Sequence, residues 1–279
     1  MIEQLRMTVL SENTAGRPDL LAEHGLAFWI EADGRHILFD TGQGFVLAHN
    51  AKTLGVDLGA TDVLVLSHGH FDHTGGMLVA RESFRQTTAY LHPLALQSKF
   101  GKRAEGAGVA VGSPISDMDT IRSHLRDVVL TEAPTQLFEG VWLTGQIPRS
   151  NDFEDTGGPF YLDKACSMPD PLLDDQAMYV QTPKGLVVFL GCAHAGVVNT
   201  VEYIAELTGA EHLHAVLGGM HLIRASEERM ARTVEALARR DVKILGPAHC
   251  TGQAATLRLW QEFPGQCIAC VAGTSVEFA

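Results

Sequence analysis

The sequence lacks any long hydrophobic run. No stretch reaches the roughly 18 consecutive apolar residues that a membrane-spanning helix requires. The N-terminal residues MIEQLRMTVL carry charges at Glu3 and Arg6, and they lack the apolar centre of a secretory signal peptide. We therefore expect a cytoplasmic protein without a membrane partner.

Basic residues are scarce and form no long run. The chain of 279 residues has 21 Lys and Arg against 33 Asp and Glu, a formal net charge of −12. Nucleic acid and anionic membranes attract positively charged surfaces, so neither is an expected partner. A small anionic substrate stays compatible with this charge, because bound divalent cations would make one spot positive. A homo-oligomer is also compatible with the sequence.

Cysteine is scarce as well. The five cysteines are odd in number, and only Cys267 and Cys270 have CxxC spacing. Without a second such pair, a four-cysteine structural zinc site is excluded. We expect reduced thiols, and we expect the stretch QCIACVAG around this pair to form a strand.

A dense group of metal-binding side chains is present in the stretch SHGHFDHTGG. His68, His70, Asp72 and His73 follow the apolar run DVLVL, which predicts a buried strand and places the group on a strand-end loop. Imidazole and carboxylate suit divalent zinc, with manganese or iron also compatible. We expect two ions, one on His68 and His70 and the other on Asp72 and His73, because two ions about 3.5–4 Å apart can share a hydroxide. A histidine-rich surface loop is the alternative.

Three later strands end in a histidine in the same way. His194, His221 and His249 each follow an apolar run and small or turn residues, in FLGCAH, VLGGMH and ILGPAH. Ligands gathered from several strand ends can converge on one rim of a sheet. The sequence therefore predicts that these histidines approach the first motif.

At HxHxDH the chain resembles the metallo-β-lactamase superfamily. The stretches EHGLAFWIE, FDTG, TGQIPR, GCAHAGVVNT, GGMHL and PAHCTG resemble a branch that includes a methanopterin-pathway synthase and uncharacterised metal-dependent hydrolases. The resemblance implies an α/β fold, a four-layer αβ/βα sandwich with two facing mixed sheets, helices outside and metals at one rim. From the chain length we expect one domain over residues 1–279, because α/β folds often run to about 200–250 residues around one core, with an insertion near the active site around residues 93–125.

The resemblance assigns roles to residues. His194 takes the remaining ligand place on the first metal, His249 is the last ligand of the second, and Asp40 supports the metal loop. Asp72 is both a ligand and a catalytic residue. The usual bridging acid is missing, so either Cys192 or no protein group takes its place. His221 resembles a histidine that protonates the leaving group; a ligand and a packed core histidine are the alternatives.

The resulting hypothesis is a metal-dependent hydrolase that uses a hydroxide held between two metals to attack a small substrate bearing phosphate or carboxylate. The alternatives are a metal-assisted condensation in pterin metabolism and a non-catalytic metal-binding module. For anion binding we single out Arg149, whose planar guanidinium suits such groups. The loop residues Lys99, Lys102 and Arg103 either bind the same anion or are simply solvated.

Local patterns add three predictions. Asp33-Gly34 between apolar runs predicts a tight hairpin. Ser226 predicts the N-cap of a helix from Glu227 to Arg240. The segment Ser150 to Asp175, rich in proline and acidic residues, predicts an excursion over the surface.

Overall fold

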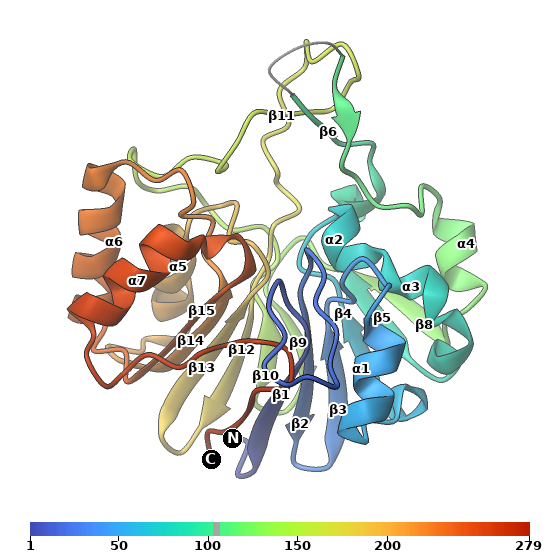
Figure 1. Cartoon of the computed structure of the whole chain (residues 1–279), viewed down its shortest axis with the longest axis horizontal. Coiled ribbons are helices and arrows are strands. Elements are labelled where there is room, and N and C mark those ends of the chain that lie inside the picture. The colour runs from blue at the N-terminus through green and yellow to red at the C-terminus, as the bar shows by residue number, and fades with distance from the viewer. Residues whose placement is uncertain (103–106) are drawn as a thin grey trace.

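Two mixed β-sheets face each other, and helices cover the outer face of each (Figure 1). The computed structural model describes residues 1–102 and 107–279. Helix α1 and the short α2 to α4 lie outside one sheet, and α5 to α7 lie outside the other (Figure 1). The predicted αβ/βα sandwich is confirmed.

The first sheet combines an antiparallel half with a parallel half. Its order is β16 (Ser275–Glu277), β1 (Leu5–Ser11), β2 (Ala27–Ala32), β3 (Arg35–Phe39), β4 (Val63–Val65), β5 (Thr88–Leu91) and β8 (Asp127–Leu130). Pairing is antiparallel from β16 to β3 and parallel from β3 to β8.

The second sheet repeats this division. Its order is β15 (Ile244–Ala248), β14 (Leu213–Gly219), β13 (Gly185–Leu190), β12 (Met178–Thr182), β10 (Val141–Leu143) and β9 (Thr135–Phe138). The β15, β14 and β13 strands are parallel, and the rest pair antiparallel. Each sheet thus has parallel strands whose carboxyl ends lie at one edge.

Helices are short next to the first sheet and longer next to the second. The α-helices are α1 (Leu47–Leu54), α2 (Phe71–Thr74), α3 (Gly76–Val79), α4 (Met118–Arg122), α5 (Val197–Thr208), α6 (Glu227–Arg239) and α7 (Gln253–Glu262). The 3-10 helices are η1 (Leu58–Ala60), η2 (Arg81–Phe84), η3 (Pro93–Leu96) and η4 (His249–Thr251). Among the described residues, no helix is long and apolar enough to cross a membrane.

The apolar run of β13 shows how the sequence builds the layers. Successive side chains of a strand point to opposite faces. Leu186, Val188 and Leu190 pack against α5 to α7, whereas Val187 and Phe189 pack between the two sheets. Because both faces of this strand are buried, its sequence is a continuous apolar run and does not alternate between apolar and polar residues.

The local predictions have mixed outcomes. The Asp33-Gly34 hairpin is confirmed, with both residues at positive φ between β2 and β3. The Ser226 cap is confirmed, since its side chain accepts a hydrogen bond from the Arg229 amide. The strand at QCIACVAG is wrong: Cys267 makes only an isolated bridge to Leu245, and the final strand is β16.

The segment 150–175 is also more than the predicted surface excursion. Its strand β11 (Phe160–Tyr161) pairs with β6 (Phe100–Gly101), which pairs with β7 (Val109–Ala110). This small sheet projects at the end opposite the two chain termini (Figure 1). Its strands come from both the 93–125 segment and the 150–175 segment, so the two segments meet above the sandwich.

Candidate metal centre

The first motif follows β4, and the histidines predicted downstream follow β13, β14 and β15. Because parallel strands end at the same edge, their loops converge. His68, His70 and His194 form one triad, and Asp72, His73 and His249 form another.

The first triad contains three buried imidazoles. The Nδ1 atom of His70 lies 2.9 Å from His68 Nε2 and 3.2 Å from His194 Nε2. The outer nitrogens of the other two rings have fixed partners: His68 Nδ1 lies 2.9 Å from Ser67 Oγ, and His194 Nδ1 lies 2.8 Å from the Thr156 carbonyl oxygen. These partners turn the Nε2 atoms toward the centre, as outer hydrogen bonds do for metal-binding histidines.

Burial also sets the charge of this triad. It lowers the pKa of His68 and His194 well below the usual value, and it lowers the pKa of His70 to about 3. The three rings are therefore neutral at neutral pH. Neutral imidazole is the form that binds metal.

The second triad mixes a carboxylate with two imidazoles. Asp72 Oδ2 lies 3.3 Å from His249 Nε2 and 3.9 Å from His73 Nε2, and the two Nε2 atoms lie 3.3 Å apart. Burial disfavours the charged forms of Asp72 and His73, but the attraction between opposite charges is in sum the larger effect. Asp40 and Asp72 raise the pKa of His73 to about 9, and His73 is the chief cause of the lowered pKa of Asp72.

Asp40 lies where a supporting residue is expected. Its Oδ2 accepts a hydrogen bond from His73 Nδ1 at 2.6 Å and one from Ser67 Oγ at 2.7 Å, and its Oδ1 accepts from the Ser67 amide at 2.7 Å. The carboxylate therefore links the two triads and leaves His73 Nε2 facing Asp72. Asn13 holds His249 in the same manner, through Oδ1 at 2.9 Å from Nδ1.

The donor atoms fit divalent metal ions. Tetrahedral zinc with bonds of about 2.0–2.1 Å places neighbouring ligands about 3.3–3.4 Å apart. The measured separations of 2.9 to 3.9 Å lie around that value. The outer nitrogens of four of these imidazoles are already bonded, and only the outer Nε2 of His70 is buried without a partner. Imidazoles held in this way have few other uses for a converging lone pair. The two triads could each hold one ion.

Cys192 lies between the triads, on the loop where the resembling family has its bridging acid. Its Sγ lies within 4.8 Å of ligand atoms of His68 and His194 on one side and of His73 and His249 on the other. Its distance to His73 Nε2 is 3.2 Å. The Cys192 thiol therefore lies between the two groups of ligand atoms, close enough to contact an ion on either side. A thiol that binds a metal loses its proton.

His221 lies beside the first triad. Its ring centroid is 4.4 Å from that of His194, and its Nδ1 atom is buried without a hydrogen-bond partner. Burial lowers the pKa of His221, but Cys250 and Asp175 outweigh that effect and raise it. The ring packs on Gly157, where an added Cβ would lie 1.9 Å from its Cδ2 atom. This placement keeps both the ligand and the proton-donor roles open, and it removes the packed-core alternative because His221 lines a cleft.

Four residues in these loops have a left-handed backbone conformation, which residues other than glycine rarely adopt. They are Asp40, Ala193, His221 and His249, with φ between 46° and 60°. Such strain persists only where the surrounding structure holds it, and it gathers at functional sites.

A cleft of about 430 Å³ opens above the triads. It is lined by His70, Asp72, Cys192, His221 and His249, and by the apolar side chains of Phe71, Val111, Phe160 and Ile223. Lys102 and Arg224 also line it, and both are exposed without an acidic partner within 4 Å in the described part of the chain. The cleft therefore combines side chains that could bind metal, an apolar wall and two cations.

The other predicted anion-binding residues lie elsewhere. The Arg149 guanidinium donates to the Pro171 carbonyl oxygen at 2.8 Å, and Arg149 is not among the residues that line the cleft. Lys99 is neither solvated nor in the cleft: it is buried, 3.0 Å from Asp170 and 2.8 Å from Asp174. Arg103 lies outside the described residues.

The Lys99 ion pair supports the metal loop instead. Asp174 accepts a hydrogen bond from the Gly69 amide at 2.8 Å, between the ligands His68 and His70. Phe71 donates its amide to the Val111 carbonyl oxygen at 3.0 Å. The 93–125 segment is thus bonded directly to the metal loop.

Sequence reasoning missed two features of the site. His24 lies 3.1 Å from Asp72 Oδ2, although it follows no buried strand. The stretch from Thr156 to Phe160 orients His194 and contacts His70 and His221 through the Phe160 ring. His24 lies in the motif EHGLAFWIE, which was a signal for it. No spacing rule identifies the stretch from Thr156 to Phe160.

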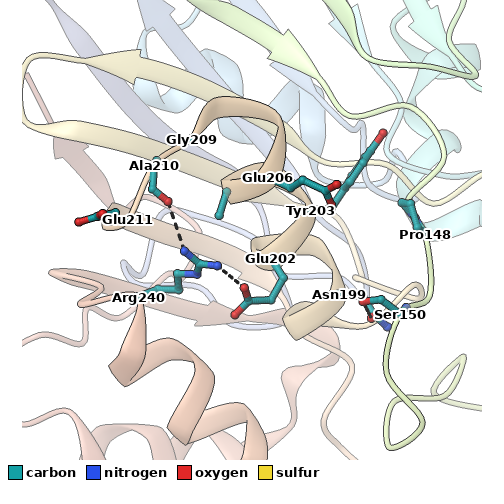
Figure 2. Close-up of a pocket in the computed structure, with 11 residues that line it drawn as sticks. Pro148, Ser150, Asn199, Glu202, Tyr203, Glu206, Gly209, Ala210, Glu211 and Arg240 are labelled. Atoms are coloured by element: carbon teal, nitrogen blue, oxygen red, sulfur yellow. Dashed lines mark hydrogen bonds and ion pairs between the residues drawn. The ribbon is translucent and has the colours of Figure 1, made fainter.

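A second hollow, of about 400 Å³, lies beside α5 (Figure 2). It is lined by Pro148, Ser150 and residues of α5, together with Arg240, which pairs with Glu202. It contains no histidine or cysteine. Among the described residues, each group of side chains that could hold a metal ion includes at least one residue that lines the cleft.

Comparisons with known proteins agree with this geometry. The model of the metallo-beta-lactamase superfamily matches residues 21–164. The chain belongs to this superfamily.

Two relatives from Methanocaldococcus jannaschii are each 30% identical to the chain. One is 7,8-dihydropterin-6-methyl-4-(beta-D-ribofuranosyl)-aminobenzene-5'-phosphate synthase, matched over 99% of this chain and 98% of the relative. The other is an uncharacterized protein, matched over 91% and 93%.

Among solved structures, a metal-dependent hydrolase of the beta-lactamase superfamily superposes with a TM-score of 0.82 at 29% identity, covering 98% of both chains. A metallo-beta-lactamase fold protein from Bacillus subtilis superposes with a TM-score of 0.58 at 14% identity, covering 99% of both chains, and shows the fold alone.

Proposed function

We propose that the protein is a metal-dependent hydrolase of a small substrate that carries a phosphate or carboxylate group. The observation that carries this proposal is the pair of triads on either side of Cys192, at the floor of a cleft that also holds Lys102 and Arg224. An open cleft above the ligand atoms favours catalysis over a closed structural site.

Two divalent ions, when bound, would supply an activated water and stabilise developing negative charge. Zinc is the preferred ion. His68, His70 and His194 would hold one ion, and Asp72, His73 and His249 would hold the other. The Asp40 carboxylate and the Thr156 carbonyl oxygen keep the ligand rings in place throughout the reaction.

The other residues of the cleft have separate tasks. Lys102 and Arg224 attract the anionic group of the substrate, and Arg224 can grip it with two parallel hydrogen bonds. The Phe160 ring provides an apolar wall beside His70 and His221. His221 holds a proton for the leaving group at a ring nitrogen, which suits its raised pKa.

A second candidate function is a metal-assisted condensation in pterin metabolism. It is favoured by the full-length match to a relative that is named a synthase of a dihydropterin-containing phosphate. Such a substrate would place its planar ring against Phe160 and its phosphate near Lys102 and Arg224. The same triads would serve both reactions.

Metal content and turnover separate these functions. Elemental analysis of the purified protein is expected to give two ions per chain. A generic phosphodiester and a lactone then test hydrolysis, and a pterin precursor with a ribosyl-aminobenzoate phosphate tests condensation. Each is run beside His68→Ala as a control for contaminating activity. Turnover only of the precursor pair would replace the first proposal by the second, and metal without any turnover would leave a metal-binding module.

A further inference from the structure

His24 is a metal-competent side chain of the cleft to which the sequence assigned no role. It lies on the connection between β1 and β2, and its Nε2 atom lies 3.1 Å from Asp72 Oδ2. Its ring centroid is 4.8 Å from that of His249. The ligand atoms of His24, Asp72 and His249 all lie within 4.8 Å of one another. The 3.1 Å separation matches those within the two triads.

The backbone around His24 is fastened to the metal loop. Leu26 donates its amide to the carbonyl oxygen of Asp72 itself at 3.2 Å. An added Cβ on Gly25 would lie 2.8 Å from that same oxygen, so a side chain at this position would collide with the Asp72 backbone. His24 is therefore positioned by direct contact with the residue it faces.

Two further contacts fix this turn from its other side. Glu23 accepts hydrogen bonds from the amides of Gln43, Gly44 and Phe45, and the Gln43 side chain donates to the His24 carbonyl oxygen. Asn13 accepts from the Gly25 amide with the same Oδ1 atom that contacts His249. One side chain thus contacts both the His249 ring and the backbone next to His24.

The exposure of His24 differs from that of the two triads. Its side chain is 58% exposed, whereas that of Asp72 is 9% exposed and those of His73 and His249 are almost fully buried. A structural role in the core is therefore excluded. A rigidly held imidazole at the rim of a cleft, directed at a buried carboxylate, can reach an ion that the carboxylate binds.

We propose that His24 is a further ligand, through Nε2, of the ion held by Asp72, His73 and His249. This inference rests on the proposed metal centre. It makes the centre asymmetric: apart from the shared Cys192, one ion has four protein ligands and the ion of the first triad has three. With Cys192 counted, the ion of the first triad has four protein ligands and the other ion has five, so the first has more room for substrate. The reacting position then belongs to the first triad, beside His221 and Phe160.

Zinc binding to His24 variants tests this inference. The metal-free full-length protein is titrated with zinc against a chromophoric chelator, for the wild type, His24→Ala and His24→Gln. His212→Ala is the matched control, because His212 is an exposed histidine outside the cleft. Thermal unfolding of the metal-free proteins checks that each variant is folded, as expected for a side chain that is mostly exposed.

We expect two zinc ions in the wild type and in His212→Ala. In His24→Ala the dissociation constant of one ion rises by at least about tenfold and that of the other is unchanged, since removing even a residue that only supports a ligand costs about 10–100-fold. His24→Gln should behave like His24→Ala. Glutamine can still donate a hydrogen bond to Asp72. If His24→Gln binds zinc with wild-type affinity, His24 acts only as a hydrogen-bond donor to Asp72, and the inference is overturned.

Failure of this inference is distinguishable from failure of the proposed function. Two tightly bound ions in both the wild type and His24→Ala would remove His24 from the ligands and leave the metal centre intact. No zinc in the wild type would overturn the metal centre and this inference with it.

Discussion

The two triads are built from similar residues but differ in charge. The first contains three neutral imidazoles, oriented by a hydroxyl and a carbonyl oxygen. The second contains a carboxylate and an imidazole whose pKa is raised to about 9, oriented by the Asp40 carboxylate. Burial keeps the imidazoles of the first triad neutral, whereas ion pairing keeps the carboxylate and an imidazole of the second triad charged. The two should therefore respond differently to mutation and to pH.

Removal of one ligand from each triad should have the largest effect. His68→Ala should lose the ion of the first triad, and Asp72→Ala that of the second, with activity abolished in both and folding retained. The reason is that each residue supplies a converging donor that nothing nearby replaces. Elemental analysis and circular dichroism measure the outcome, and two ions per chain in either variant would contradict the assignment.

The pH dependence of zinc binding should distinguish the triads next. Below pH 9 an ion must displace the proton of His73, so affinity at the second triad should rise about tenfold per pH unit between pH 6 and 8. His70, with a pKa of about 3, imposes no such cost on the first triad. Cys192, as a ligand shared by the two ions, adds the same pH dependence to both zinc affinities, so the difference between the triads remains. Chelator competition across this range measures the two slopes, and equal slopes would refute the distinction.

Loss of the Asp40 carboxylate should affect the second triad more than the first. Asp40→Asn keeps the shape but weakens the hydrogen bond from His73 Nδ1, which should cost about 10–100-fold in affinity for the second ion. Asp33→Asn is the matched control, because Asp33 is also an aspartate at positive φ but lies at the hairpin far from the site. If both variants bind zinc equally well, Asp40 has no role in metal binding.

The smallest effect is expected at the mouth of the cleft. Arg224→Ala should raise KM for an anionic substrate several-fold, corresponding to about 1 kcal/mol for an exposed ion pair, with kcat and metal content nearly unchanged. Arg149→Ala is the control and should leave both constants unchanged, since Arg149 does not line the cleft. A raised KM in Arg149→Ala with an unchanged KM in Arg224→Ala would instead support the prediction, made from the sequence, that Arg149 binds the anion.

These residues also show what the sequence could predict. The convergence of His194 and His249 followed from apolar strands that end in histidine, because strand-end position constrains where a side chain lies. The αβ/βα architecture and the supporting role of Asp40 were predictable only through family resemblance. Both kinds of prediction depended on short local motifs.

The features that failed depend on contacts between distant segments. Lys99 was assigned to a basic loop, but it pairs with Asp170 and Asp174, about seventy residues later in the chain. Arg149 follows a strand end like the histidines do, yet it turns toward the Pro171 carbonyl oxygen. His24 reaches Asp72 only because β2 brings Leu26 beside the metal loop. The pairings of Lys99 and Arg149 have no local sequence signal, and the only signal for His24 was its place in the motif EHGLAFWIE.

The most direct test of the account is a crystal structure of the zinc-loaded protein with anomalous scattering from the metal. The account predicts two peaks. One should lie about 2.0–2.1 Å from nitrogens of His68, His70 and His194, and the other at similar distances from Asp72, His73 and His249, with Cys192 between them. A single peak, or peaks away from these six side chains, would contradict it.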